Sequence, residues 1–476
     1  MCINLRHIGL IGLGPHARRI YYPVIEKYAQ LNGFNLVFVI EVEGKQESVQ
    51  AFIKTRRIQP LSTFFINSLF SQNDILSSDL REFLDNSIEQ YKLDGVIIAS
   101  EPKSHKAYLK WALEKNIDIL TDKPITCPKN AANDRNDALT IIQDFNELKG
   151  LYQASRSNLI VQAQRRAHLG YCYLYNYLSD FLNEFQVPIT HIEVSHADGM
   201  WVMPNEWERE HHSYKYGTGK LMHSGYHFVD LLAWFIQLNQ LVKDREADEL
   251  ELFVKHSSPS DFMQNLTAEH YQKFFQKDYS KYFSDDQIER VKEYGEQDVF
   301  VLAQLKRQQS IVTTATLNLQ QNSLSSRAWS NTPVDVYKGN GRIRHEQVNI
   351  HVSVLLNIQV HSYQSYQVNN PIDMEYGPGH IDHFDILVFR NNGVVGGKRF
   401  EQIEIGKNLA NSLPATSQFS HNETARENLF LDFIKRSDSK SDLLHHSFTN
   451  ELLSRIYECI ALERNGKFPH LSCSLT

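Results

Sequence analysis

A glycine-rich turn close to the N-terminus, at residues 8–17, constrains the fold more than any other feature. A short apolar run from Ile8 to Ile11 indicates a strand, and a helical pattern follows from about Ala17 to Asn32. Gly12 permits a sharp turn between them, and Gly14 presents no side chain to a molecule that approaches the backbone. A strand, a glycine turn and a helix N-terminus together favour a pyrophosphate, because free N–H groups and the helix dipole attract an anion. The residues expected to hold a dinucleotide here are Gly12, Gly14, Pro15, His16 and Ala17.

Strand-like and helix-like segments alternate through the first 164 residues. Further apolar runs are typical of strands buried on both faces, at residues 36–40, 95–99, 117–121 and 159–163. A helical stretch over 104–115 separates two of them. Such alternation indicates βαβ units and a parallel sheet. We therefore predict an α/β fold with a Rossmann-type dinucleotide-binding domain over residues 1–164.

Glu41 ends the second of these strands. An acid at this place can accept hydrogen bonds from the hydroxyls of the adenosine ribose. A carboxylate also repels a 2′-phosphate, so Glu41 favours NAD as the cofactor. Lys45 lies nearby and keeps NADP open as the alternative.

The pattern changes in residues 165–476, which we predict to form a second, α+β domain. Segments 299–305, 310–318 and 350–359 are typical of strands in a large, open, mostly antiparallel sheet. Residues 257–298 are polar, charged and aromatic, which indicates an insertion that decorates this domain. Helices cover only one face of such a sheet, so we expect an apolar opposite face. We therefore expect a homo-oligomer, a dimer or tetramer, that pairs through that face.

Composition excludes several classes of protein. The net charge of −7 disfavours a nucleic-acid binder, which needs a basic face. No apolar run approaches the ~20 residues that cross a membrane, so we expect no membrane partner. Five widely spaced cysteines suit free thiols in a reducing compartment. The first residues lack the pattern of a signal peptide, and the cytoplasm is the expected location.

Three ordered motifs between residues 5 and 235 resemble the Gfo/Idh/MocA family of glucose–fructose oxidoreductase, inositol dehydrogenase and related sugar dehydrogenases. The first is the stretch 94–105, a strand followed by a proline and then a histidine. The second is Asp122-Lys123-Pro124, where the family has Glu-Lys-Pro. The third is the glycine-rich segment 217–230, in which His227 and Asp230 fall where the family has its histidine and a following aspartate. His223 stands where the family usually has aspartate.

The resemblance implies an NAD(P)-dependent oxidoreductase. It would transfer a hydride between the nicotinamide and a secondary alcohol of a sugar, cyclitol or related polyol. Lys123 and His227 would act together on the substrate hydroxyl, with His223 beside them. An imidazole titrates near neutral pH and an ammonium favours an alkoxide-like oxygen, so which of the two carries the proton stays open. The residues that would contact the cofactor in addition to the glycine turn are Ser100, Glu101, Pro102, His105, Asp122 and Lys123.

Three further residues are expected to bind substrate. Arg165 and Arg166 follow the last strand of the first domain and should reach the cleft between the domains. Asp230 is the third. His223, His227 and Asp230 can share one helix face, which is also a spacing of metal ligands. We expect no metal, because the family's redox step needs none.

Two other functions stay open at this point. One is an NAD-using glycoside hydrolase, in which the cofactor oxidises the substrate and then restores it. The other is a catalytically silent NAD-binding regulator, suggested by His223 in place of aspartate.

Overall fold

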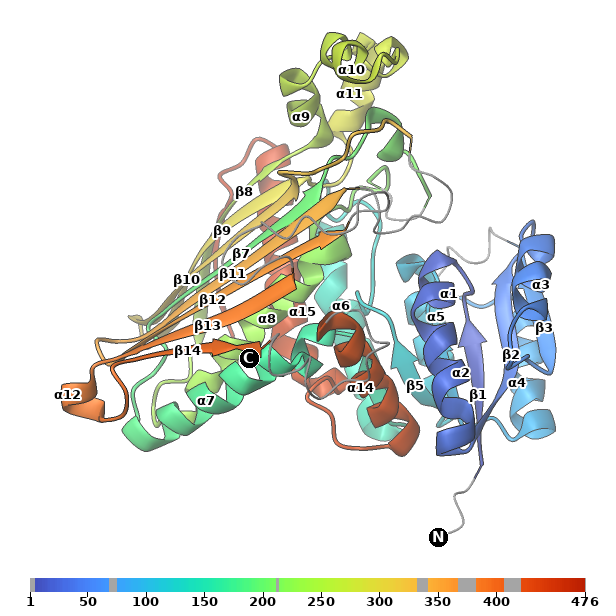
Figure 1. Ribbon diagram of the computed structural model, residues 1–476, viewed down its shortest axis with the longest axis horizontal. Helices are drawn as coiled ribbons and strands as arrows, with labels where there is room; N and C mark the ends of the chain where they lie inside the picture. Colours follow the sequence, from blue (N-terminus) through green and yellow to red (C-terminus); the bar gives the residue numbers. More distant parts are fainter. Residues whose placement is uncertain are drawn as a thin grey trace. The chain divides into compact units, whose positions relative to one another are not determined.

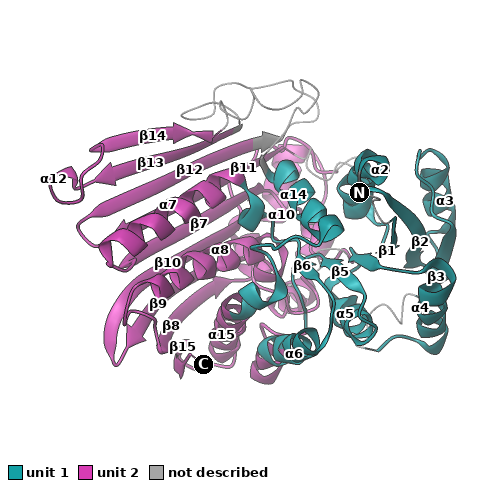
Figure 2. Ribbon diagram, turned by 90° about the horizontal axis from the view of Figure 1, so that it is seen from below, with its two compact units in different colours: residues 1–128, 141–168, 422–447 teal, residues 129–140, 169–421, 448–476 magenta. Residues whose placement is uncertain are grey.

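The structure is a computed structural model that describes residues 5–67, 75–210, 214–331, 341–366, 382–405 and 421–475. The chain divides into two compact units (Figure 2). Unit 1 contains residues 1–128, 141–168 and 422–447, and unit 2 contains residues 129–140, 169–421 and 448–476. The division into domains at residue 164 stays a prediction. The units add residues 422–447 to the N-terminal part of the chain.

Unit 1 is built on a six-stranded parallel sheet in the order β3-β2-β1-β4-β5-β6. Its strands are β1 (Arg6–Ile11), β2 (Phe34–Val42), β3 (Ser62–Ile66), β4 (Gly95–Ile98), β5 (Asp118–Thr121) and β6 (Leu159–Val161). Every residue of β4 and β5 is buried, as expected for strands covered on both faces. The predicted Rossmann-type sheet is confirmed. The edge strand β3 was not predicted, because its residues are mostly half-buried and carry no long apolar run.

Helices cover both faces of this sheet with apolar cores. They are α1 (Pro15–Arg19), α2 (Tyr21–Asn32), α3 (Gln46–Lys54), α4 (Ser78–Tyr91), α5 (His105–Glu114), α6 (Arg135–Ala154) and α14 (His421–Lys435). Phe430 and Phe433 of α14 belong to the core that also contains Ile8 and Ile97 of the sheet. A Cβ on Gly95 would lie 2.9 Å from the Phe433 ring, so glycine is needed for this close approach. A segment more than 300 residues away in sequence therefore completes the core of unit 1.

Unit 2 contains a nine-stranded sheet in the order β14-β13-β12-β11-β7-β10-β9-β8-β15. Its strands are β7 (His191–Met200), β8 (Glu249–Ser257), β9 (Asp298–Arg307), β10 (Ser310–Asn322), β11 (Arg342–Val352), β12 (Leu356–Tyr366), β13 (Asp382–Arg390), β14 (Phe400–Glu404) and β15 (His470–Ser474). The β7–β10 ladder is parallel and the other ladders are antiparallel. The predicted open, antiparallel-rich sheet is confirmed.

The expected single strand over 350–359 is wrong. β11 ends at Val352 and β12 begins at Leu356. Ser353, between them, has a φ of +48°, which turns the chain back. Apolar residues on both sides of this short turn conceal it in the sequence.

One face of the nine-stranded sheet is covered by α7 (Leu169–Phe185), α8 (Tyr226–Ile236) and α15 (Ser447–Arg464) (Figure 2). Side chains that alternate with the buried ones point to the opposite face. On the central strands these are His191, Glu193, Ser195, Gln347, Asn349, Asn357 and Gln359. The expectation of an apolar opposite face is therefore wrong for the centre of the sheet, because its outward positions are polar. The homo-oligomer stays a prediction.

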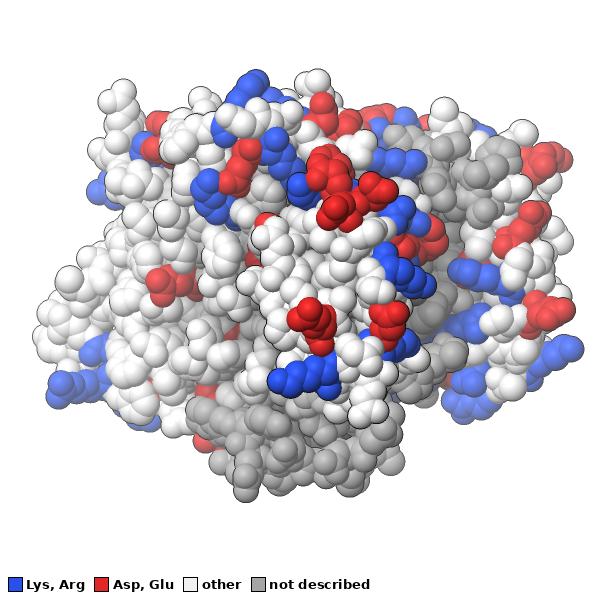
Figure 3. Space-filling model, turned by 90° about the horizontal axis from the view of Figure 1, so that it is seen from above, with Lys and Arg blue, Asp and Glu red and all other residues white. Residues whose placement is uncertain are grey.

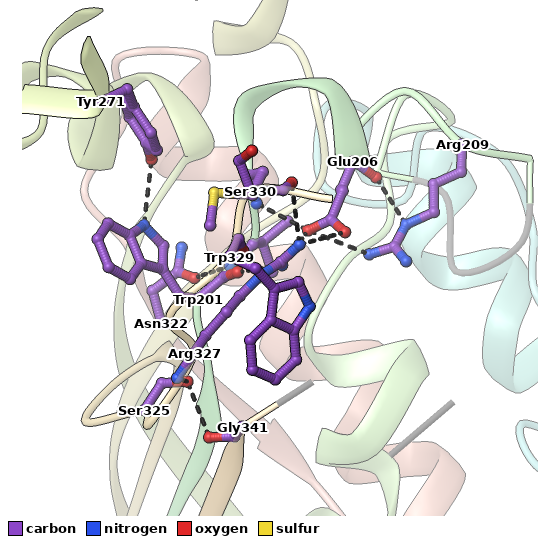
Figure 4. Close-up of polar contacts among 12 residues, drawn as sticks. Trp201, Glu206, Arg209, Tyr271, Asn322, Ser325, Arg327, Trp329, Ser330 and Gly341 are labelled. Carbon is purple, nitrogen blue, oxygen red and sulfur yellow. Dashed lines mark hydrogen bonds and ion pairs between the residues drawn. The ribbon is translucent and has the colours of Figure 1, made fainter. Parts of the chain in front are cut away.

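Between β8 and β9 the insertion forms three short helices, α9 (Pro259–Asn265), α10 (Ala268–Phe275) and α11 (Asp285–Lys292), seen at the top of Figure 1. Trp207 is fully buried against α9 and α11. The neighbouring loop is fixed by a buried ion pair between Arg327 and Glu206, with Nη1 2.7 Å from Oε2 (Figure 4). Arg327 also donates to the carbonyl oxygens of Trp201 and Trp329. The insertion is thus packed against the rest of unit 2, through the core that contains Trp207.

Charged side chains of both signs are interspersed on the face shown in Figure 3. Within the described ranges, no helix is long and apolar enough to cross a membrane.

Candidate functional site

The glycine turn of unit 1 is shaped for a close approach to its backbone. Gly12 has a φ of +92°, and a Cβ there would lie 2.6 Å from the carbonyl oxygen of Ala99. A Cβ on Gly14 would meet nothing within 4 Å, so the space above this residue is open. Gly14 is the N-cap of α1, Pro15 occupies the first turn and Ala17 is buried against the sheet. The five residues predicted to hold a dinucleotide thus lie together at the carboxyl end of β1.

Glu41 connects the end of β2 to this turn. Its Oε2 accepts the N–H of Leu13 at 2.9 Å, and its Oε1 accepts the N–H of Val42 at 2.9 Å. The ammonium of Lys45 lies 3.4 Å from Oε1. The carboxylate is buried, so these donors offset the loss of hydration. Glu41 is therefore fixed beside the turn, as required of an acid that faces the ribose of a dinucleotide.

The loops after β4 and β5 are joined by His105. This fully buried ring contacts the carbonyl oxygen of Pro124 through Nδ1 at 2.8 Å and that of Ser100 through Nε2 at 3.1 Å. Burial lowers the pKa of His105. A neutral ring has one N–H and donates to one of the two carbonyls. Ser104 donates to the carbonyl of Glu101, and Ser100 is hydrogen-bonded to Ser104. The predicted residues Ser100, Glu101, Pro102 and His105 therefore form one fixed loop.

Asp122 lies where β5 meets the glycine turn. The hydroxyl of Tyr21 donates to its Oδ1 at 2.5 Å, and Nε2 of His16 lies 3.6 Å from its Oδ2. Burial acts to raise the pKa of Asp122, but the nearby His16 and the Tyr21 hydrogen bond hold it below its ordinary value. The half-buried Lys123 follows directly and precedes Pro124. Sequence reasoning missed Tyr21, because a tyrosine on a helix carries no signal of a partner 101 residues away.

These residues fit a dinucleotide. Gly14 leaves open space where a pyrophosphate would approach, and the turn offers backbone N–H groups. Gly12, Gly14 and the start of α1 would hold the phosphates, and Glu41 would bind the ribose.

Arg165 and Arg166 are both fully buried in unit 1. Arg165 donates to the side-chain oxygen of Asn422 at 2.7 Å. Arg166 donates to the carbonyl oxygens of Lys440 and His445 at 3.0 and 2.9 Å. These contacts connect the segment after β6 to the first turn of α14 and to the segment after α14. Substrate binding by the two arginines stays a prediction.

In unit 2 the predicted histidines lie on a π-helical turn, η5 (Leu221–Gly225), and on α8, which follows it. His223 has φ −86° and ψ −111°, which breaks the helix at this residue. The expectation that His223 and His227 share the face of one continuous helix therefore does not hold. The N–H of Gly225 donates to the carbonyl of Lys220 at 2.8 Å, which produces the wider turn. His223 is half-buried against the ring of Tyr214, whereas His227 is only 7% exposed.

Sequence reasoning missed a buried lysine, Lys220, which directly precedes this turn. The ammonium of Lys220 lies 2.9 Å from Oγ of Ser224, 3.1 Å from Nδ1 of His196 and 3.6 Å from Asp198. Burial lowers the pKa of Lys220 far below its ordinary value. Arg342 of β11 pairs with the same Asp198. We call Lys220, His196, Asp198, Ser224 and Arg342 the lysine cluster.

Asp230 points to another part of unit 2. It is fully buried, and its Oδ1 accepts the hydroxyl of Thr449 on α15 at 2.8 Å. Its role in substrate binding stays a prediction, as does the convergence of Lys123 in unit 1 with His227 in unit 2. Among the residues that the structure describes, no group of three histidine, cysteine or acidic side chains could hold a metal ion.

Residues 6–141 match the model of an oxidoreductase family with an NAD-binding Rossmann fold, GFO_IDH_MocA. The predicted resemblance and the predicted nicotinamide cofactor are thereby confirmed for this part of the chain. No curated protein sequence matches the chain significantly.

Solved structures share the fold over the whole chain. An aldose–aldose oxidoreductase from Caulobacter crescentus, complexed with glycerol, is 11% identical, with 99% of this chain and 100% of that chain covered and a TM-score of 0.55. A levoglucosan dehydrogenase with NADH and levoglucosan is 10% identical, with 99% of each chain covered and a TM-score of 0.56. An NAD-binding oxidoreductase from Klebsiella pneumoniae is 11% identical, with 99% of each chain covered and a TM-score of 0.57. At these identities the likeness shows the fold.

Proposed function

We propose that this chain, whose residues 6–141 belong to the NAD-binding Rossmann fold of an oxidoreductase family, is an NAD-dependent dehydrogenase of a sugar, cyclitol or related polyol. The observation that carries the proposal is the open space above Gly14, beside a buried acid at the end of β2. Proteins with the same fold include enzymes crystallised with glycerol and with levoglucosan, both polyhydroxylated molecules.

Within this proposal each side chain has a distinct role. A bound nicotinamide supplies the group that accepts or gives the hydride. Lys123 follows β5 at the sheet edge where doubly wound folds bind ligands, and its ammonium would hydrogen-bond the substrate hydroxyl. His227, in the first turn of α8, would take the hydroxyl proton, with His223 beside it. Arg165, Arg166 and Asp230 would bind the substrate.

Three finer features belong to the proposal. NAD is preferred over NADP, because the Glu41 carboxylate would face a 2′-phosphate. The protein acts in the cytoplasm, which agrees with its separated cysteines. It forms a homo-oligomer.

The test is cofactor reduction against a panel of sugars and polyols, followed by absorbance of NADH. With an active substrate, Lys123→Ala and His227→Ala should each lower turnover by roughly 10²–10⁴-fold while NAD affinity stays nearly unchanged. The double variant should be far less than additive, since both act on one hydroxyl. Lys54→Ala and His470→Ala, at exposed positions, are matched controls and should leave turnover unchanged.

The panel also distinguishes the other two functions. Sugar release without net NADH would contradict the dehydrogenase and support the glycoside hydrolase. NAD binding with neither product would support the regulator.

A further inference from the structure

The end of the insertion meets the turn that carries His223. The carbonyl oxygen of Glu296 accepts the N–H of Lys220 at 2.9 Å. A Cβ on Gly219 would lie 2.0 Å from that same oxygen, and a Cβ on Gly295 would lie 2.1 Å from the backbone of Thr218. The two segments therefore pack backbone against backbone, with glycine on each side of the contact.

The side chain of Glu296 adds a second connection. Its carboxyl is fully buried, and Oε1 accepts both the N–H of Leu221 and the hydroxyl of Tyr457, each at 2.8 Å. Leu221 is the first residue of η5, and Tyr457 lies on α15. The other oxygen, Oε2, is buried and has no hydrogen-bond partner within the described part of the chain. A single carboxyl oxygen thus ties the start of the π-helical turn to a long helix.

We propose that Glu296 is a positioning residue, which fixes the backbone of Leu221 and thereby the place of His223 and His227 in the substrate site. The proposal rests on the proposed dehydrogenase function. It assigns a role to the insertion, whose last residues hold the turn. A displacement of about 1 Å in a catalytic group can cost about 10²-fold in rate, so a fixed turn matters for turnover.

The charge state of Glu296 should change how firmly it holds the turn. The groups that face it are Tyr457 and Arg464 of α15, Tyr214, and the N–H of Leu221. Burial raises the pKa of Glu296 to about 7. A carboxylate is a stronger hydrogen-bond acceptor than a neutral acid. The hydrogen bond from the Leu221 N–H to Glu296 should therefore become stronger as the pH rises through this range.

The first test compares substitutions that keep or remove the acceptor. Glu296→Gln keeps the volume and an oxygen acceptor but cannot ionise, so turnover should persist while its pH profile loses an ionisation near 7. Glu296→Ala removes the anchor and should lower kcat about tenfold or more, with NAD affinity unchanged. Tyr457→Phe removes one donor and should have a smaller effect. The matched control is Glu289→Gln, on the exposed surface of α11, which should behave as wild type.

The second test needs no activity. In full-length protein labelled with ¹⁵N-leucine, the amide signal of Leu221, assigned through Leu221→Met, should titrate near pH 7 and stop doing so in Glu296→Gln. Titration without NAD reduction on any polyol would support the positioning contact and contradict the proposed function. The positioning proposal is overturned if the Leu221 amide does not titrate, or if Glu296→Ala and Glu296→Gln both match Glu289→Gln in kcat and pH profile.

Discussion

The glycine turn of unit 1 and the lysine cluster of unit 2 stabilise a candidate site in opposite ways. The turn is formed by backbone: Gly12 adopts a φ that other residues avoid, and Gly14 leaves open space. The lysine cluster is formed by side chains, with Asp198 paired to the buried Arg342 and 3.6 Å from Nζ of Lys220. A backbone site depends on residues that lack a side chain, whereas the cluster depends on charges that balance one another. Substitutions in the glycine turn and in the lysine cluster should therefore have different effects.

The largest expected effect is in the lysine cluster. Asp198→Asn keeps the shape of the side chain but leaves the guanidinium of Arg342 without its buried counter-charge. Removing one partner of a buried ion pair costs about 3–5 kcal/mol, so the free energy of unfolding in urea should fall by about that amount. Glu193→Gln, at an exposed position of the same strand, should change it by less than about 0.5 kcal/mol. An equal, small loss in both variants would contradict the view that the cluster is held by charge.

The next effect separates the two glycines of the turn. Gly12→Ala should lower the free energy of unfolding by about 1–3 kcal/mol, because alanine is strained at positive φ and its Cβ would strike Ala99. Gly14→Ala meets no protein atom and should change stability by less than about 1 kcal/mol. Its methyl group would instead occupy the open space and weaken NAD binding by at least about tenfold, or ~1.4 kcal/mol. Thermal unfolding and calorimetric NAD titration measure the two quantities. Unchanged NAD affinity in Gly14→Ala would show that the dinucleotide does not approach there.

A smaller, pH-dependent effect concerns His105. Burial lowers the pKa of His105 in the folded protein, whereas the unfolded chain keeps the ordinary value of about 6.5. As the pH falls, the unfolded chain therefore binds a proton at a higher pH than the folded protein does. The stability that His105 contributes is therefore present above pH 6.5 and lost as the pH falls, by up to ~1.4 kcal/mol per pH unit. Urea unfolding at pH 7.5 and 5.5 should show a weaker pH dependence in His105→Gln than in wild type. The exposed control His470→Gln should keep the wild-type dependence, and a His105→Gln slope equal to it would contradict the inferred burial effect.

The smallest expected effect is in cofactor choice. Glu41→Ala should weaken NAD binding about tenfold, ~1.4 kcal/mol, and NADP binding much less, because the ribose loses an acceptor while the repulsion of a 2′-phosphate disappears. Fluorescence titration with each cofactor measures the ratio of the NAD affinity to the NADP affinity. Wild-type protein that binds NADP about tenfold tighter than NAD would refute the assignment of Glu41.

The contrast between the two regions also explains how far the sequence could predict this protein. Gly12, Gly14 and the buried runs of β1, β2, β4 and β5 act through local chemistry, which is visible in a short stretch of sequence. Asp122 and Tyr21, or Lys220 and Asp198, lie on different elements, and their partnership depends on the folded chain. The break at His223 and the edge strand β3 were missed because neither leaves a periodic pattern. The polar outward positions of the large sheet were present in the sequence. They became interpretable only when strand register was known.

Because α14 belongs to unit 1, the core of this unit can be completed only late in synthesis. The chain changes unit after residues 128, 140, 168, 421 and 447, and Phe430 and Phe433 complete the core around β1. During synthesis, more than 250 residues must therefore follow residue 168 before α14 can cover the apolar surface of the N-terminal part. Nascent chains of intermediate length should expose that surface, bind chaperones and be cleaved readily by proteases. A fragment cut after residue 168 would remain permanently at this stage, so the dinucleotide-binding unit is not a module that can be transplanted as one continuous piece.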